Sequence, residues 1–450
     1  MRHSKGWTRQ NNKLALKQQL LTREVMICSL DLAKKKHAFH VLDCDQHALA
    51  RGHVPHTRDG FERLLATLEE LRRAKGFARM VFFMEGASHF WMTIVSLLDR
   101  KGYEYRLVLN RAVGHQRHVS GESGHKNDPI DAQLIGTLAT SLRFSFSQLP
   151  RQADWIGLRA CACEYQELID LITAEKNRIH AFLETVLPDY YQTFADPFTA
   201  TSLAVLRSLT DSSVLEDQQF VDAVRHAFEG RNLQVQRCLA IWQYLRAGDP
   251  WGYVEARPAL LQRLATAAAR LQLLLRQRNA ERERLLTVYA RIPYASNLNS
   301  ILGSSAVGNA VLLGLLGDPK AFDDSAAVVR MAGLDPGECS SGEYVGRSHI
   351  TKVGRSRLRR AAVSATLAVL KSGKNPQFVR RFFSLQQRER RPLKALQALC
   401  ACAGKYLRTL WWLCVHDCSY NTDIAMSGFV DKKPQTLVTP EEELVIDLAN

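Results

Sequence analysis

The sequence predicts a mixed α/β domain followed by largely helical domains. Up to about residue 150, short apolar segments alternate with segments of helical periodicity. Beyond that point, long helical patterns replace them, some with a seven-residue repeat. The chain has 450 residues, of which 46% are hydrophobic, enough for two or three domains with buried cores.

The α/β part opens with three strand patterns in close succession, "EVMICSLDLA", "HAFHVLD" and "ALARGHVPH". A helix follows in "RDGFERLLATLEELRRAKG", with Asp59 expected at its cap, and strands in "ARMVFFME" and "EYRLVLN" alternate with further helices. Three strands followed by this alternation are typical of RNase H-like nucleases, although a Rossmann-like domain gives a similar order. Because no glycine-rich phosphate loop follows the first strand, the nucleotide-binding alternative is weaker.

The middle of the chain predicts a coiled coil. Apolar residues recur every seven positions at Leu158, Tyr165, Ile172, Ile179 and Val186, and a second helix over about 258 to 290 has similar leucine spacing. These helices can pair within one chain or join two subunits. The predicted boundaries are an extension at 1–24, an α/β domain at 25–150, a coiled-coil and helical insert at 151–290, a mostly helical C-terminal domain at 291–424 and a tail at 425–450.

The charge of the chain favours a polyanionic partner. Sixty Lys and Arg against 45 Asp and Glu give a formal net charge of +15. Between residues 341 and 408 there are sixteen basic residues but only two acidic ones, whereas a solvated face usually mixes both signs. We therefore predict a nucleic-acid-binding surface rather than a membrane-binding one. Its expected contacts are Arg347, Lys352, Arg355, Arg357, Arg359, Arg360, Arg380 and Arg381.

The cysteines and the N-terminus indicate a cytoplasmic protein with reduced thiols and no membrane association. The ten cysteines show no disulfide framework, and the first residues lack the apolar core of a signal peptide. Cys414, His416 and Cys418, with Cys400 and Cys402 nearby, could suggest zinc. Helical periodicity without a paired CxxC motif favours core packing for these side chains instead.

Four acidic residues occupy positions that suit a metal site. Asp31 ends the first predicted strand, Glu85 ends the fourth, and Asp128 and Asp131 lie one turn apart at the start of a helix. Helix capping before Pro129 would also explain Asp128, and Asp131 suits the helix dipole. Acids that end two buried strands are harder to explain structurally, so together the four predict metal binding.

Several of these segments resemble a known family. The stretches "SLDLAKKKHAFHVLD", "MEGASHFW" and "KNDPIDAQLIG" are similar to the three acidic motifs of the DEDD insertion-sequence transposases, the IS110 group that includes Piv-type DNA invertases. The segment "FDDSAAVVRMAGLDPGECSSGEYVGRSHITKVGRSRLRRA" resembles that family's second conserved domain. The resemblance implies a RuvC-like, that is RNase H-like, domain whose four acids, Asp31, Glu85, Asp128 and Asp131, are catalytic and bind Mg²⁺, with Mn²⁺ as the alternative ion.

The resemblance also implies a serine nucleophile just before a glycine. In "CSSGEY" this position falls on Ser341, with the adjacent Ser340 as the second candidate. An ester between serine and phosphate conserves the energy of the broken strand until a new hydroxyl attacks, which suits recombination better than simple cutting. Taken alone, such a triplet is more commonly a surface turn.

Members of the family use a structured bridge RNA that pairs with donor and target DNA, and they act as tetramers. By resemblance we expect donor and target DNA, a guide RNA and a homo-oligomer, dimer or tetramer, as partners. The sequence thus predicts a Mg²⁺-dependent DNA transposase or site-specific recombinase. The alternatives are a hydrolytic, junction-resolving nuclease with the same acids and a non-catalytic nucleic-acid binder.

Overall fold

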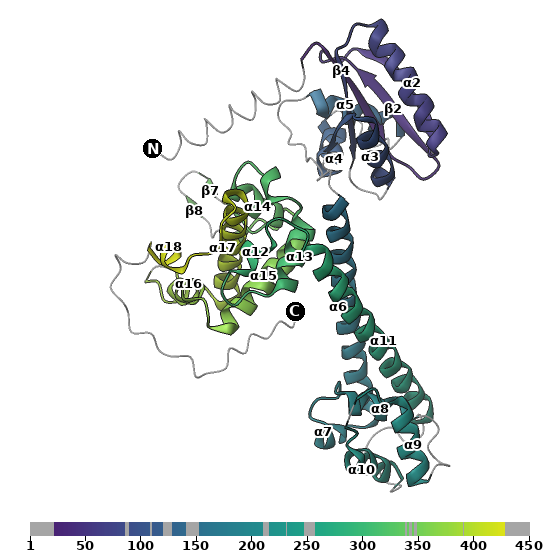
Figure 1. Cartoon of the computed structure of the whole chain (residues 1–450), viewed down its shortest axis with the longest axis vertical. Coiled ribbons are helices and arrows are strands. Elements are labelled where there is room, and N and C mark those ends of the chain that lie inside the picture. Colours follow the sequence, from purple (N-terminus) through teal and green to yellow (C-terminus); the bar gives the residue numbers. More distant parts are fainter. Residues whose placement is uncertain are drawn as a thin grey trace. The chain divides into compact units, whose positions relative to one another are not determined.

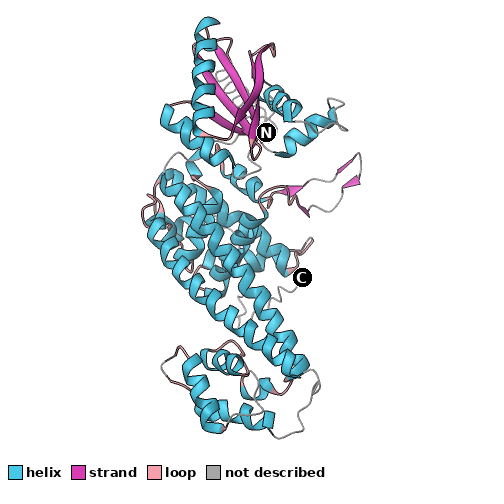
Figure 2. Cartoon of the chain, turned by 90° about the vertical axis from the view of Figure 1, so that its right-hand side faces the viewer, coloured by secondary structure: helices cyan, strands magenta, loops and turns pink. Residues whose placement is uncertain are grey.

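The computed structural model describes residues 22–85, 90–108, 110–119, 128–140, 153–209, 216–230, 232–246, 257–337, 340–341, 344–345, 349–389 and 391–427. The chain divides into two compact units, Met1–Arg151 and Gln152–Asn450 (Figure 1). The first unit combines a sheet with helices, whereas the second is mainly helical (Figure 2). The predicted mixed α/β segment followed by a mostly helical remainder is therefore confirmed.

The first unit contains a five-stranded sheet. Its elements are β1 (Val25–Asp31), β2 (Lys36–Leu42), β3 (Ala48–Pro55), α2 (Arg58–Ala74), β4 (Arg79–Glu85), α3 (Phe90–Lys101), β5 (Glu104–Val108), α4 (Asn110–Val119) and α5 (Asp128–Thr140). The strand order is β3-β2-β1-β4-β5. β1, β2 and β3 form an antiparallel meander, and β4 and β5 extend it in parallel from β1. This meander excludes the all-parallel sheet of a Rossmann-like domain.

The sheet is covered by helices on both faces, because successive side chains of a strand point to opposite sides. Met26 and Leu30 share a core with Phe61 of α2 and Leu98 of α3. Their neighbours in the strands, represented by Ile27 in β1, share a second core with the side chains of α5. One face therefore supports α2 and α3, and the other supports α5.

The start of α2 differs from the sequence prediction. Thr57 is the cap residue, and its hydroxyl accepts a hydrogen bond from the backbone N–H of Gly60 at 3.1 Å. Asp59, expected at the cap, lies in the first turn instead. Threonine and aspartate are both good cap residues, so the pattern alone could not separate two positions this close together.

The second unit begins with helices that run out to a small helical insert and back. The outgoing helix is α6 (Ala153–Val186), and the returning helix is α11 (Arg257–Tyr289). Between them lie α7 (Tyr190–Thr193), α8 (Ala200–Ser208), α9 (Asp217–Ala227) and α10 (Val235–Arg246), which pack on the ends of both long helices around Trp242. Arg270 of α11 pairs with Glu175 of α6 at 2.9 Å. The two helices thus pair within one chain, and the four apolar positions of the seven-residue repeat other than Tyr165 are buried.

The remaining helices surround one large core, to which the near ends of α6 and α11 contribute Leu158 and Leu285. Its elements are α12 (Ala295–Asn299), α13 (Ala306–Leu316), the short 3-10 helix η1 (Pro319–Ala321), α14 (Ser325–Ala332), α15 (Ser356–Ser372), α16 (Pro376–Gln386), α17 (Ala395–His416) and α18 (Thr422–Ser427). Cys402 and Cys414 are fully buried in this core, as the packing interpretation predicted, whereas Cys400 and Cys418 are partly buried and His416 is exposed. Within the described residues, no helix is both long enough and apolar enough to span a membrane.

A narrow β ribbon lies between α14 and α15. Its outer ladder pairs β6 (Pro336–Gly337) with β9 (His349–Ile350), and its inner ladder pairs β7 (Ser340–Ser341) with β8 (Tyr344–Val345). The base of the ribbon is held by a hydrogen bond from Thr351 Oγ1 to Asp335 at 2.7 Å. The ribbon is the element that presents the predicted serine.

Candidate active site

Asp31 and Glu85 end two neighbouring parallel strands. Leu30 of β1 is in register with Met84 of β4, so the next residue of each strand lies at the same level. By the alternation of side chains, both acids are on the face that carries Ile27 and Phe83 and packs against α5. Sheet geometry therefore brings together two carboxylates that are 54 positions apart in the sequence.

Asp131 approaches the same face from α5. This helix lies very close to the sheet at Gly136. A Cβ added there would stand 2.5 Å from Leu42 Cδ1 and 2.9 Å from Ser29 Oγ. The Asp131 side chain is only 8% exposed. Asp128 is the first residue of the same helix, but its side chain lies outside the described residues. The structure thus places three of the four predicted acids on one face of the sheet.

A cation of α4 faces these acids. Arg117, in the last turn of α4, donates hydrogen bonds to Asp131 Oδ1 from Nε at 3.2 Å and from Nη2 at 2.5 Å. The pKa of Arg117 is raised, chiefly by this hydrogen bond and against the effect of burial, and the charges of Asp131, Glu85 and Asp31 add to the rise. Carboxylates from β1, β4 and α5 therefore act on one guanidinium. The sequence alone did not indicate Arg117, since its partner Asp131 lies 14 positions away on a different helix.

The donor chemistry of this face fits a divalent cation. Carboxylate oxygens are the ligands that Mg²⁺ and Mn²⁺ prefer, and three carboxylates here raise the pKa of one guanidinium. Within the described residues, however, no three His, Cys, Asp or Glu side chains stand close enough to hold one ion. Asp31, Glu85 and Asp131 could ligate a metal only after the Arg117 guanidinium or the carboxylates move.

Two histidines connect the segments next to Asp31 and Glu85. His37 in β2 is fully buried, and its Nδ1 accepts a hydrogen bond from the backbone N–H of Ala33, just after β1, at 3.0 Å. Its Nε2 lies 2.7 Å from Nδ1 of His56. The His56 ring in turn contacts Phe90, the first residue of α3 after β4. With Nδ1 occupied as an acceptor, a neutral His37 carries its proton on Nε2 and donates it to His56.

Burial, followed by the charge of His56, lowers the pKa of His37 from its ordinary 6.5 to about 4. His37 is therefore neutral near neutral pH. Through His56, His37 links the segment that follows Asp31 to the start of α3, the helix that follows Glu85 in the chain.

The serine candidates occupy the inner ladder of the ribbon. Ser340 is paired with Val345, and Ser341 with Tyr344, so Ser341 is the last residue before the two-residue connection. Gly342 and Glu343, and the side chains of both serines, lie outside the described residues. Ser341 is one position closer than Ser340 to Gly342, and a nucleophilic role for either serine stays a prediction.

Several basic residues predicted to bind nucleic acid are engaged within the protein. Arg357 and Arg360 pair with Glu167 and Asp170 of α6 at 2.8 and 2.7 Å. Arg355 donates to the carbonyl of Leu315 at 2.8 Å, and burial, with a smaller effect of Arg159, lowers its pKa to about 10.

The other members of that set differ from one another in their surroundings. Arg359 donates to the carbonyl oxygens of Ala332 and Lys352 at 3.0 and 3.4 Å. Arg380 is exposed, and Arg347 lies outside the described residues. The structure therefore gives Arg355, Arg357, Arg359 and Arg360 structural contacts, and nucleic-acid binding by the set stays a prediction.

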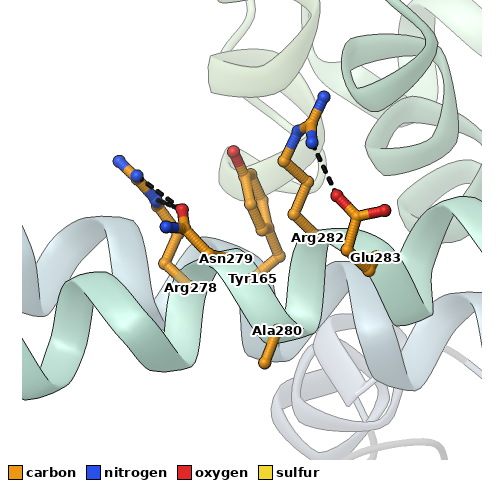
Figure 3. A pocket seen from close by; sticks show the side chains of 6 residues that line it. All are labelled: Tyr165, Arg278, Asn279, Ala280, Arg282 and Glu283. Carbon is orange, nitrogen blue, oxygen red and sulfur yellow. Dashed lines mark hydrogen bonds and ion pairs between the residues drawn. The ribbon is translucent and has the colours of Figure 1, made fainter. Parts of the chain in front are cut away.

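A pocket of about 700 Å³ lies along the α6–α11 pair. Figure 3 shows the Tyr165 ring standing between the side chains of Arg278 and Arg282. Arg278 donates to Asn279 and Arg282 to Glu283, each at 2.7 Å. The lining contains one carboxylate and no nucleophile of the predicted set, so it offers no chemistry comparable to the face around Arg117.

Comparison with protein families gives two matches. A model of DEDD transposases of the IS110 type, described as a transposase, matches residues 28–188. A second model, described as the transposase IS116/IS110/IS902 family, matches residues 295–382. A search of curated proteins finds no match. The first match includes all four predicted acids, and the second includes both serine candidates.

We expect Arg117→Gln to destabilise the protein in the absence of divalent ions by about 3 to 5 kcal/mol, because it leaves the buried Asp131 carboxylate without its cation. Mg²⁺ should then stabilise this variant more than the unchanged protein, since the ion replaces the lost positive charge. Chemical denaturation with and without Mg²⁺ measures both effects, with the exposed Arg100→Gln as control. Equal Mg²⁺ responses in all three proteins would contradict convergence of the acids on one cation position.

The stability of the protein should fall as the pH drops from about 7 to about 4. The folded pKa of His37 lies below its unfolded value, so the unfolded chain binds the proton first and acid favours unfolding. His37→Gln should be less stable at neutral pH and less sensitive to acid, whereas exposed His53→Gln should match the unchanged protein. Chemical denaturation across this pH range tests the expectation, and an unaltered pH dependence in His37→Gln would refute it.

Proposed function

Because the chain belongs to the IS110-type transposases, we propose that it cuts and rejoins DNA with an RNase H-like, RuvC-like acidic site and a serine nucleophile. Family membership supports DNA transposition in general, and the acidic site and the serine are the finer part of the proposal. The observation that carries it is that Asp31 and Glu85 end neighbouring strands on the sheet face that α5 covers, and that both, with Asp131, raise the pKa of Arg117. The strand order β3-β2-β1-β4-β5 with an antiparallel meander supports the RNase H-like assignment.

In the proposed site, Asp31, Glu85 and Asp131, together with Asp128, would hold Mg²⁺ or Mn²⁺. Divalent metal use is suggested by the DEDD family. The bound ion supplies electrostatic stabilisation of the charge that develops on the phosphate oxygens. The close packing of α5 on the sheet holds Asp131 near the face that carries the ends of β1 and β4. The His37–His56 pair supports the chain segments next to Asp31 and Glu85.

Ser341 is the proposed nucleophile. Its oxygen forms a bond to phosphorus while the bond from phosphorus to one deoxyribose oxygen breaks. The serine proton passes through solvent to the leaving oxygen. In the second step a DNA hydroxyl attacks the same phosphorus, and the serine recovers a proton. Two exchanges of one ester for another conserve the bond energy, so the strands are rejoined without a separate energy source.

A guide RNA and assembly into a homo-oligomer, dimer or tetramer, complete the proposal. They are supported by the family resemblance and by the net charge of +15, which favours binding of long polyanions. In this arrangement base pairing selects the DNA sequence, while the protein contacts the nucleic-acid backbone. Sequencing of RNA that copurifies with the chain tests the guide role, and the absence of an enriched structured species would contradict it.

Asp31→Asn, Glu85→Gln and Asp131→Asn should each reduce DNA strand cleavage by at least about 100-fold, because each removes a negative charge from the metal site. The exposed Asp45→Asn in the same unit is the matched control and should cleave normally. Cleavage of supercoiled donor DNA in Mg²⁺ measures the effect, alongside a folding check. Full cleavage by Asp31→Asn would instead favour a non-catalytic nucleic-acid binder.

Ser341→Ala should abolish the covalent protein–DNA adduct, because the alanine has no oxygen to form the ester. Ser340→Ala, the neighbouring control, should retain it. Denaturing gels of labelled DNA incubated with each variant detect the adduct. Strand cleavage that persists in Ser341→Ala at the unchanged rate would support the hydrolytic nuclease, and loss of the adduct only in Ser340→Ala would move the nucleophile by one residue.

A further inference from the structure

Three cations gather where α16 packs against α17. They are Arg381 of α16 and Lys405 and Arg408 of α17, and we call them the Arg381 cluster. Arg381 lies one turn after Phe378, whose ring packs against Tyr406, the residue next to Lys405, at a centroid distance of 5.7 Å. Nη1 of Arg408 lies 4.0 Å from the position that a Cβ would take at Gly404. All three side chains are half-buried.

No acid balances this cluster in the part of the chain that the structure describes. None of the three side chains forms an ion pair there, and the buried Nε of Arg381 has no hydrogen-bond partner. The arginines of α15 behave differently, because Arg357 and Arg360 each pair with a carboxylate of α6. The Arg381 cluster is therefore not part of the internal network of ion pairs that holds α15 to α6.

The cations of the cluster repel one another. Burial, followed by the charges of Arg381 and Arg408, lowers the pKa of Lys405. Burial and the charge of Arg381 also lower the pKa of Arg408. A half-buried group of like charges opposes folding, and an unpaired buried donor adds to that effect. A bound anion would reduce the repulsion among the three cations and could accept a hydrogen bond from Arg381 Nε.

We propose that the Arg381 cluster is a binding site for phosphodiester groups of a nucleic-acid backbone. Two guanidinium groups offer planar sets of donors that match phosphate oxygens, and the Lys405 ammonium adds a third positive charge. The site deepens the proposed function, on which it rests for the nature of its partner. DNA and RNA share the phosphodiester, and separate arms of the experiment distinguish them.

The first experiment compares Arg408→Gln with Arg237→Gln, which removes an exposed arginine of α10. Fluorescence anisotropy of the full chain with a short DNA duplex, and separately with a single-stranded RNA, gives the affinity over a series of salt concentrations. Arg408→Gln should weaken binding about tenfold and reduce the slope of log K against log salt by about 1. Arg237→Gln should change neither quantity. Loss on the DNA arm, the RNA arm or both identifies the polyanion and supports the site.

The second experiment separates binding from folding. Without nucleic acid, the double variant Lys405→Gln, Arg408→Gln should unfold at the same denaturant concentration as the unchanged protein or at a higher one, because repulsion is removed. A purely structural role predicts a lower midpoint. Unchanged affinity and slope on both arms, or a loss of stability with unchanged slope, would overturn the proposal. Neither measurement uses DNA cleavage, so failure here is distinguishable from failure of the acidic site.

Discussion

The parallel pairing of β1 with β4 is the constraint on which the candidate active site depends. Their register aligns Leu30 with Met84 and so places the two strand-end acids, Asp31 and Glu85, at one level. A shift of one residue would turn the β4 acid to the opposite face of the sheet, towards α2 and α3, because side chains alternate along a strand. The apolar residues that precede both acids are buried on both faces, as expected for the two strands in the interior of the sheet.

Carboxylates held together in this way need a positive charge nearby. Arg117 supplies one, and its bonds to Asp131 also tie the end of α4 to α5. A buried aspartate alone would shift towards its neutral form and would be a poor ligand for a hard cation. Arg117 thus gives the buried Asp131 carboxylate a counter-charge, yet a guanidinium cannot bring oxygen ligands into one coordination sphere.

The sequence predicted the order of strands and helices in the first unit well, since each strand is a compact apolar run and each helix has clear periodicity. It also indicated Asp31 and Glu85 as candidate ligands, because a charged residue at the end of a buried strand is unusual, and their metal binding stays a prediction. Arg117 and the His37–His56 pair could not be found in this way. Their roles arise from contacts between elements, and nothing in the residues around Arg117 distinguishes it from other basic positions.

The basic segment also shows that contacts between distant elements cannot be predicted from the sequence alone. Counting charges between residues 341 and 408 predicted one phosphate-binding surface, but part of that charge pairs with acids of α6, which lie about 190 positions earlier in the sequence. Sequence separation hides such compensation. The three-dimensional pairing therefore decides which cations remain for a ligand, and it favours Arg381 over Arg357 and Arg360.

The acidic residues near Arg117 and the Arg381 cluster differ in whether a counter-charge lies beside them, and this difference affects how each would bind a ligand. The acids have an internal counter-charge, so a divalent ion must bind in the presence of Arg117 and against its repulsion. A DNA phosphate at the same face would attract both cations and weaken that repulsion. Binding of the ion and of DNA should therefore be mutually favourable, and by linkage each raises the affinity for the other by the same factor. The Arg381 cluster has no internal counter-charge among the described residues. An anion can therefore bind to it without overcoming the repulsion of a neighbouring carboxylate.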